Sequence, residues 1–240
     1  MSEIVQIVIL TSAAGLCMPL GGLLASLEHI RPKWLENELR HFIIAFGGGL
    51  LLGAVFQVLL PQGVSMVGES PVAVLVFMFG GFLFFLLDRS LGLKHREAPQ
   101  LTGMLVDFVP ESIALGGLVA TEPSLAMVLA IVIGLQNAPE GFNAYRELIK
   151  SQSQQSAKVL WFMLLLVPLG PIAGLSAHYG LGDQPRTLGV IMLIAAGGIV
   201  YLMFQDIAPQ SKLKRHWAPP LGAVLGVGIT LLTELWIAGA

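Results

Sequence analysis

The chain has 240 residues, of which 55% are hydrophobic and only 12% are charged, and its formal net charge is −2. This composition excludes an ordinary soluble domain and is typical of an integral membrane protein. The near-neutral charge, without a long basic patch, argues against nucleic-acid binding, and the single Cys17 excludes a disulfide within the chain.

Eight apolar runs each approach the length of ~20 residues that crosses a bilayer core. Their approximate bounds are 3–27, 41–61, 71–88, 101–120, 124–145, 158–180, 187–207 and 218–238. The first run lacks a basic leading segment and a small-residue cleavage site, so we expect a retained helix rather than a signal peptide. The connections are too short for another domain. The sequence predicts an all-α integral membrane protein of eight transmembrane helices, with residues 1–240 forming one transmembrane domain.

The basic residues alternate between the two sides of this predicted bundle. The loops after spans one, three, five and seven, with the adjoining span ends, hold 12 of the 13 Lys and Arg residues, and Arg186 lies on the opposite side. Because basic loops tend to stay in the cytoplasm, these loops are predicted to be cytoplasmic and both termini to lie outside. With the short chain, this pattern favours a prokaryotic inner membrane and periplasmic termini.

Two short sequence patterns in the first half of the chain recur in the second half, and the two pairs are separated by nearly the same number of residues. Pro19-Leu-Gly of span one returns as Pro168-Leu-Gly in span six, 149 residues later. Gln57, four residues before a Pro in span two, returns as Gln205 in span seven, 148 residues later. The patterns recur five spans later, and because five is odd, the second copy crosses the membrane in the opposite direction. Helices 1–3 and 6–8 are therefore predicted to be inverted repeats, which are typical of transporters. The alternative is that Gly- and Pro-rich membrane helices merely look alike.

Spans four and five each carry a polar residue, a Pro and a Glu near the middle. The first motif is Asp107-Phe-Val-Pro-Glu111 and the second is Gln136-Asn137-Ala-Pro-Glu140. In each motif the Glu follows the first polar residue by four positions, so both side chains share one helix face. Each Pro lacks a backbone N–H and clashes with the preceding turn, so both helices are expected to kink. If the two helices face each other, all five polar side chains form one central cluster.

This central cluster contains three carboxylates, and neither motif contains Lys or Arg. Ionisable residues inside a membrane are costly to bury and are usually functional. Three interpretations are open. The cluster could be a structural network of protonated acids, a proton site in which crowded carboxylates share protons, or a divalent-cation site, which the lack of basic residues favours.

These motifs resemble those of the Zrt/Irt-like (ZIP) family of divalent-metal transporters, and the resemblance covers nearly the whole chain. The fourth-helix pattern of that family, His-Asn-x-x-Asp/Glu-Gly, is similar to Asp107-Phe-Val-Pro-Glu111-Ser. Its fifth-helix pattern, His-x-x-Pro-Glu-Gly, is similar to Gln136-Asn-Ala-Pro-Glu140-Gly, and its second-helix ending, Leu-His-Leu-Leu-Pro-Glu, resembles Gln57-Val-Leu-Leu-Pro-Gln. The resemblance implies outward termini, an inverted three-plus-two-plus-three arrangement and metal binding by helices four and five.

The chain departs from the family pattern at the usual nitrogen ligands. Asp107 and Gln136 replace the two motif histidines, and all five histidines of the chain are expected in loops or near span ends. Phe108 and Val167 stand where the resemblance implies further ligands, so one metal site is expected rather than two. The expected metal-binding residues are Asp107, Glu111, Gln136, Glu140 and, less directly, Asn137.

The ligand types bear on which metal is transported. Carboxylate and amide oxygens suit harder cations than imidazole does. The sequence therefore predicts a shift from zinc toward manganese or ferrous iron, or broad selectivity, although zinc also accepts Asp and Glu oxygens. No cofactor is expected beyond the transported Mn²⁺, Fe²⁺ or Zn²⁺. The expected partners are the lipid bilayer and the metal ions, and a homodimer is left open.

Three further polar residues lie toward the ends of spans two and seven. Gln57 and the pair Gln205 and Asp206 are counterparts under the inverted repeat. We hypothesise that they line the routes by which a cation reaches and leaves the centre. The alternative is that they are polar caps for carbonyl groups freed by the nearby prolines.

The sequence as a whole predicts a transporter that moves divalent metal cations toward the cytoplasm. Without an ATP-binding motif, transport would be passive or ion-coupled. A proton-linked solute carrier and a metal sensor are alternatives on the same scaffold. An intramembrane enzyme could use paired acids to activate water, but the chain has no His-Glu-x-x-His motif and is predicted not to be an enzyme.

Overall fold

The structure is a computed structural model that describes residues 1–27, 33–68, 70–91, 99–152, 155–181, 184–212 and 218–238. These residues are almost entirely helical and contain no strand. Eight of the described helical stretches are long and apolar enough to cross a membrane, which confirms the predicted all-α fold with eight spans. The eight stretches are Glu3–Leu27, Glu38–Val67, Pro71–Ser90, Leu101–Thr121, Pro123–Ile149, Ser156–Leu181, Pro185–Ser211 and Ala218–Ile237.

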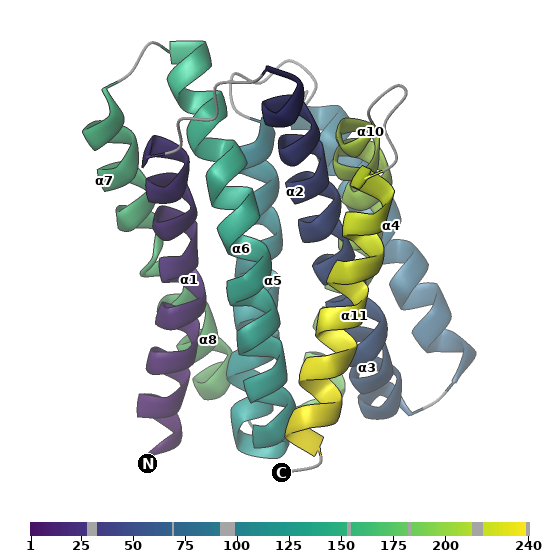
Figure 1. Cartoon of the computed structure of the whole chain (residues 1–240). Helices are drawn as coiled ribbons and strands as arrows, with labels where there is room; N and C mark the ends of the chain where they lie inside the picture. The colour runs from purple at the N-terminus through teal and green to yellow at the C-terminus, as the bar shows by residue number, and fades with distance from the viewer. Residues whose placement is uncertain are drawn as a thin grey trace.

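The helices pack as two groups (Figure 1). The first group contains α1 (Glu3–Leu27), α5 (Pro99–Thr121), α6 (Pro123–Gln152), α7 (Ser156–Leu166) and α8 (Leu169–Leu181). The second contains α2 (Lys33–Ala54), η1 (Val55–Leu59), α3 (Leu60–Val67), α4 (Pro71–Leu91), α9 (Pro185–Leu202), η3 (Met203–Ile207), α10 (Ala208–Ser211) and α11 (Ala218–Ala238). The groups meet chiefly where α6 packs against α2 and α5 against α9, so the fourth and fifth spans occupy the centre.

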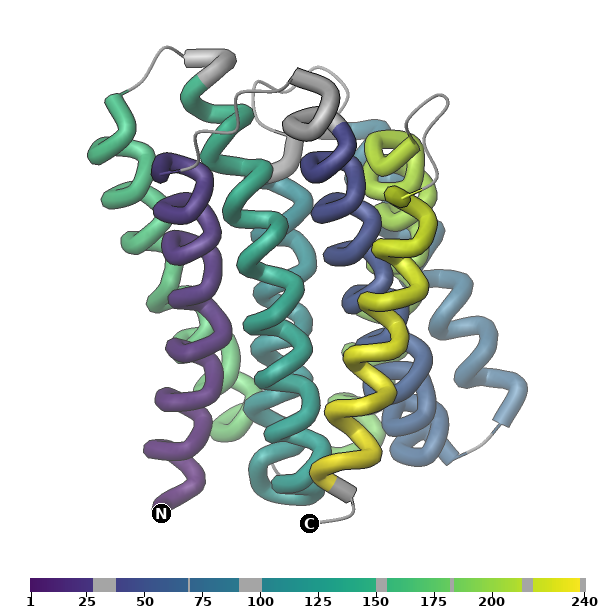
Figure 2. Tube along the Cα trace, viewed as in Figure 1, coloured from purple at the N-terminus to yellow at the C-terminus, as the bar shows by residue number. Residues whose placement is uncertain are grey.

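Both termini lie at the same end of the bundle, as Figures 1 and 2 show. We call this the terminal end, and we call the opposite end, where α1 ends and α2 begins, the basic end. Arg186 begins α9 at the terminal end, whereas other basic residues lie toward the basic end, among them Arg40, Arg89, Arg146 and Lys158. The charge alternation along the chain thus corresponds to the two physical ends of the fold.

Helices α1 and α6 approach closely beside the second central motif. A Cβ atom placed on Gly141 would lie 2.2 Å from the carbonyl oxygen of Met18, and one placed on Gly21 would lie 2.0 Å from that of Ala138. Neither position has room for a larger residue without moving a helix. Close helix packing therefore explains why a glycine directly follows Glu140.

The second and seventh spans each contain a π-helical turn at matched positions. The turn η1 covers Val55–Leu59 and η3 covers Met203–Ile207, so the two turns are separated by 148 residues. After each turn, a backbone N–H donates to a carbonyl oxygen five residues back. Such turns are rare in proteins and often occur at functional sites. Their recurrence at the offset found in the sequence supports the predicted repeat.

Helix continues past Pro61 and Pro209, although the sequence predicted that spans two and seven end near these residues. The second span runs on to Val67 and the seventh to Ser211. Each Pro falls at the start of the next α-helical segment, where a missing N–H is tolerated. The π-helical turn accommodates the interruption, so Gln57 lies well inside its span rather than at the end.

Candidate functional site

The two central motifs meet between α5 and α6. Both helices continue through their prolines, Pro110 and Pro139. Asp107, Glu111 and Gln136 are at most 3% exposed. The side-chain Nε2 of Gln136 donates hydrogen bonds to Oε1 and Oε2 of Glu111, at 2.8 and 2.7 Å. The two motifs that the sequence predicts to face each other are therefore joined by direct side-chain contact.

Several buried oxygens of these motifs have no hydrogen-bond partner in the part of the chain that the structure describes. They are Oδ1 of Asp107, Oε1 of Gln136, and both carboxylate oxygens of Glu140. An unsatisfied buried acceptor costs about 1–3 kcal/mol, and more if it is charged. By contrast, the buried Asp88 of α4 accepts a hydrogen bond from the Tyr201 hydroxyl at 2.8 Å. Unpartnered carboxylate oxygens are thus a feature of the central motifs rather than of every buried acid in this fold.

A cavity of about 30 Å³ lies beside Asp107 and Glu140, in the half of the bundle nearer the basic end, and neither Glu111 nor Gln136 lines it. This volume holds one or two water-sized species. The polar residues that line it come from α5, α6 and η3, and they are Asp107, Glu140, Asn143 and Asp206. The lining contains no His or Cys among the described residues. The cavity therefore presents oxygen and amide groups to whatever occupies it.

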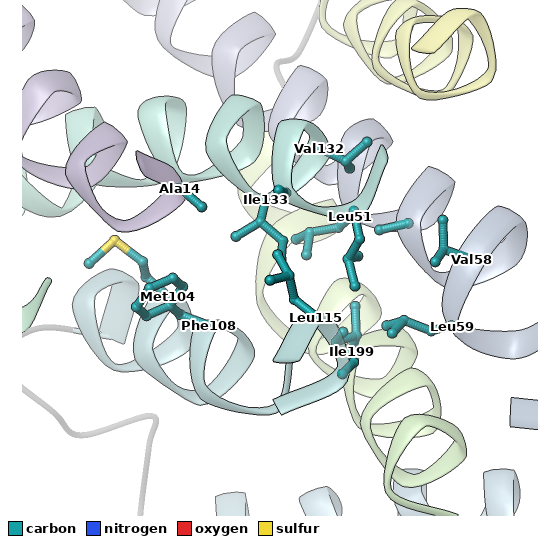
Figure 3. Close-up of a cluster of buried hydrophobic side chains, with 14 of the residues drawn as sticks. Ala14, Leu51, Val58, Leu59, Met104, Phe108, Leu115, Val132, Ile133 and Ile199 are labelled. Carbon is teal, nitrogen blue, oxygen red and sulfur yellow. The ribbon is translucent and has the colours of Figure 1, made fainter. Parts of the chain in front are cut away.

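Along their helices, a set of buried apolar side chains lies between the motifs and the terminal end. Residues from α2, η1, α5, α6 and α9 converge there (Figure 3), and each is at most 1% exposed: Leu51, Leu59, Leu115, Ile133 and Ile199. We call these five residues the apolar layer. Packed hydrocarbon thus separates the motifs from the terminal end, and a charged species could not cross it without a conformational change.

Asn137 contacts α1 rather than the cavity. Its Nδ2 donates a hydrogen bond to the backbone carbonyl oxygen of Ala14 at 2.9 Å, and its side chain is 1% exposed. Gln136 and Glu140 lie one turn apart on α6, and Asn137 lies on the neighbouring face. The structure therefore assigns the Asn137 amide group to the packing of α6 on α1.

The three residues hypothesised to line a pathway lie in the π-helical turns. Asp206 lines the cavity in the basic half of the bundle. Gln57 and Gln205 are partly buried, and Oε1 of Gln57 has no partner among the described residues. Along α2 and η1, Gln57 follows Leu51 of the apolar layer, so it lies farther toward the terminal end than the cavity does. Gln57 and Asp206 thus stand on opposite sides of the central motifs.

Phe108 and Val167 fill space that polar ligands would otherwise need. Phe108 is fully buried and lies beside Met104 (Figure 3). A Cβ atom on Gly15 would lie 3.0 Å from the Phe108 ring, and one on Gly170 would lie 2.6 Å from it. Val167 is also buried. Packed hydrocarbon therefore occupies the positions at which the resemblance implies further ligands.

No three His, Cys, Asp or Glu side chains within the described residues are grouped so that they could hold a metal ion in this conformation. A cation in the cavity would therefore need amide oxygens or water besides the carboxylates, or a helix movement that draws the carboxylates together. His41 near the start of the second span and His178 in α8 lie away from the centre, as expected. Three histidines lie outside the described residues: His29, His95 and His216.

Asn143 is the cavity residue that sequence reasoning missed. It follows Glu140 by three positions and Gln136 by seven, so it shares their face of α6. Its side chain is 3% exposed, and its Nδ2 donates a hydrogen bond to the Pro139 carbonyl oxygen at 2.9 Å. Its spacing from Glu140 and Gln136 could have revealed it, but Asn143 lies outside the six-residue motif that begins at Gln136.

Several known zinc transporters are similar to this chain. Zinc transporter ZIP9-A of Xenopus laevis is 21% identical over 274 aligned positions, which cover 90% of each chain. Zinc transporter ZIP9 of Xenopus tropicalis is 20% identical with the same coverage. Zinc transporter ZupT of Shigella flexneri is 31% identical over 138 positions, which cover 57% of this chain and 48% of ZupT. No family model matches the chain.

These similarities confirm the resemblance to the Zrt/Irt-like family that the motifs predicted. Two of the relatives match along nearly the full length of the chain, so the resemblance is not confined to the two central motifs. The relatives are named as transporters and not as enzymes, in agreement with the prediction that this chain is not an enzyme.

Proposed function

We propose that this chain is a membrane transporter that carries divalent metal cations toward the cytoplasm through the central motifs. One observation carries the proposal. Buried oxygens of Asp107 and Glu140 lack partners within the described residues, and both residues line a cavity that Asp206 also lines. A cation in the cavity would offset the charge of these carboxylates, whereas a neutral solute would leave that charge uncompensated. The names of the similar zinc transporters support the same substrate class.

We infer the orientation of the site from the positive-inside rule and the position of the cavity, and we propose inward transport. With the basic end in the cytoplasm and the termini outside, the cavity lies on the cytoplasmic side of the motifs. The apolar layer then separates the site from the outside, so this conformation is closed outward. We propose that cations arrive past Gln57 when the layer parts and leave past Asp206, in the inner membrane of a bacterial cell.

The two helix groups suggest how the apolar layer parts. α5 and α6 pack with α1 and α8, while α2 packs with α11 and α4 with α9. Three residues of the layer, Leu51, Leu59 and Ile199, come from the second group, and two come from the first. Movement of the first group against the second would separate these side chains while the motifs stay intact, as in transporters built from repeats.

The chemistry of the site favours manganese or ferrous iron, or broad selectivity, over a strict preference for zinc. The polar lining supplies carboxylate and amide groups, and its described residues include no His or Cys. Oxygen donors suit harder divalent ions, and imidazole and thiolate suit zinc. Because carboxylates must be deprotonated to bind metal, cation binding would also release protons and make uptake depend on pH.

Uptake by proteoliposomes tests the proposal. Mn²⁺, Fe²⁺, Zn²⁺, Co²⁺, Ni²⁺ and Cd²⁺ would each be offered to vesicles that hold the wild type, Glu140→Ala or Glu122→Ala. Glu122 is an exposed acid between α5 and α6 and serves as the matched control. We expect Glu140→Ala to lower uptake by about a hundredfold and Glu122→Ala to leave it unchanged. A folded wild type that takes up none of these ions would refute metal transport and favour a sensor or a proton-linked carrier.

A further inference from the structure

In the side-chain amide of Asn143, the nitrogen has a hydrogen-bond partner and the oxygen has none among the described residues. Its Nδ2 donates a hydrogen bond to the carbonyl oxygen of Pro139, one turn back on α6. Because that carbonyl can only accept, the contact fixes which end of the amide is nitrogen. The remaining atom, Oδ1, is buried and has no partner among the described residues. An amide whose donor is held and whose oxygen is open is oriented to accept from, or coordinate, another group.

The open oxygen belongs to a residue that lines the cation cavity. Asn143 contributes to the same lining as Asp107, Glu140 and Asp206. It is 3% exposed, so bulk water does not satisfy its oxygen. Asp107 and Glu140 likewise present unpartnered oxygens within the described chain. Three neighbouring residues on two helices thus share the same unmet requirement for a positive partner.

We propose that Asn143 is a metal-binding and specificity-determining residue whose Oδ1 coordinates the cation together with Asp107 and Glu140. This inference rests on the proposed function and adds a ligand outside the central motifs. A neutral amide oxygen raises the number of ligands without adding charge. Manganese and ferrous iron bind six oxygen-type ligands readily, whereas zinc is usually satisfied by four. The Asn143 oxygen therefore favours the ions with the larger coordination number.

The competing explanation is that Asn143 only holds the Pro139 carbonyl, and two substitutions separate the two roles. Asn143→Asp keeps an oxygen for the cavity but cannot donate to Pro139. Asn143→Ser can donate back to that carbonyl, as helical serines do, but its shorter side chain does not extend the oxygen into the cavity. A ligand role predicts that Asp preserves binding and Ser loses it, and a purely structural role predicts the reverse.

Binding of Mn²⁺ and Zn²⁺ to the purified full chain in detergent gives the direct readout, with uptake as a second one. We expect Asn143→Ser and Asn143→Ala to raise the Kd for Mn²⁺ about tenfold, which corresponds to about 1.4 kcal/mol. The Kd for Zn²⁺ should change much less, and Asn143→Asp should bind Mn²⁺ as tightly as the wild type. Thr230→Val serves as a matched control, because it removes a buried side-chain hydrogen bond on α11, away from the cavity lining.

Two results with the variants would overturn the inference: Mn²⁺ affinity unchanged in both Asn143→Ser and Asn143→Ala, or affinity lost in Asn143→Asp and kept in Asn143→Ser. Either result is separate from failure of the proposed function, which shows as a wild type without uptake or as uptake that does not depend on Glu140. A wild type that binds no Mn²⁺ would overturn the inference as well. If Asn143→Ala does not fold, the comparison of Asp with Ser still decides between the roles.

Discussion

The Gln136 amide donates to both carboxylate oxygens of Glu111, at 2.8 and 2.7 Å, and so joins α6 to α5. Glu111 is therefore satisfied by the protein itself. Asp107 and Glu140 differ, since each has carboxylate oxygen without a partner in the described chain. This division predicts that Asp107 and Glu140 bind the cation first, while the pair of Gln136 and Glu111 holds the two central helices together until a cation draws Glu111 away.

Replacement of Glu140 by Gln should stabilise the metal-free protein and remove its response to metal. The substitution keeps the shape of the side chain and removes a buried negative charge that has no partner in the described chain. We expect a higher Tm without metal and no further rise with Mn²⁺, whereas the wild type should be stabilised by the ion. Thermal unfolding in detergent checks this, and an identical metal response in both proteins would contradict it.

Replacement of Asn137 by Ala should weaken the fold more than it weakens metal binding. The substitution removes the bond to the Ala14 carbonyl oxygen and leaves that buried acceptor with one partner fewer. We expect a loss of about 1–2 kcal/mol in the free energy of unfolding and a nearly unchanged Kd for Mn²⁺. The opposite pattern, a large loss of affinity at an unchanged Tm, would make Asn137 a metal ligand, as the sequence first suggested.

Replacement of Gly141 by Ala should force α1 away from α6. The new Cβ would lie 2.2 Å from a backbone oxygen that cannot rotate aside, and overpacking of this kind costs about 3 kcal/mol. Gly228→Ala on α11 is the matched control, because a Cβ there meets nothing within 4 Å. We expect a lower Tm for Gly141→Ala alone. Comparable Tm values for both variants would show that α1 and α6 are not so tightly packed.

Replacement of Phe108 by Ala should destabilise the protein without changing the number of bound ions. Phe108 is fully buried, and loss of a buried aromatic ring costs about 3–5 kcal/mol. In the wild type the ring fills the gap beside Gly15 and Gly170, and the change to Ala adds no ligand, so we expect one Mn²⁺ per chain in both proteins. Equilibrium binding measures this stoichiometry, and two ions per wild-type chain would refute the single site.

Replacement of Asp206 by Asn should slow release of the cation into the cytoplasm more than it weakens binding. Asp206 lines the cavity from η3, on the basic-end side of the motifs. We expect uptake to fall about tenfold with a smaller change in the Kd for Mn²⁺, since the effect lies in a transport step. Parallel measurements of uptake and equilibrium binding test this. Unchanged uptake would leave Asp206 as a cap of its helix segment.

The eight spans could be predicted because their signal is the length of apolar runs, and the described helices confirm it. The meeting of the two motifs was also predictable, since Asp107 and Glu111 share a face, as do Gln136 and Glu140. The π-helical turns were not predictable. A Pro in an apolar run usually marks the end of a helix. The residues around Pro61 and Pro209 give no sign that a preceding π-helical turn allows the helix to continue.

The candidate site was predicted less completely than the fold. A linear motif specifies positions on one helix, but the cavity is lined by residues of five helical segments, including Gly47 of α2 and Leu202 of α9. Asn143 belongs to it through helical spacing, and Asn137 is excluded from it by a bond to α1. Both residues are asparagines on α6, so residue type alone could not distinguish the ligand candidate from the packing residue.

The matched π-helical turns bear on the ancestry of the chain. A π-helical turn is an α-helix with one residue inserted, and it persists where the neighbouring packing has adapted to the extra residue. The turns at Val55–Leu59 and Met203–Ile207 occur 148 residues apart and each precedes a Pro. Separate origins of the two halves would require the same insertion twice. A single insertion in a shared three-helix ancestor, followed by duplication, would account for both turns with one event.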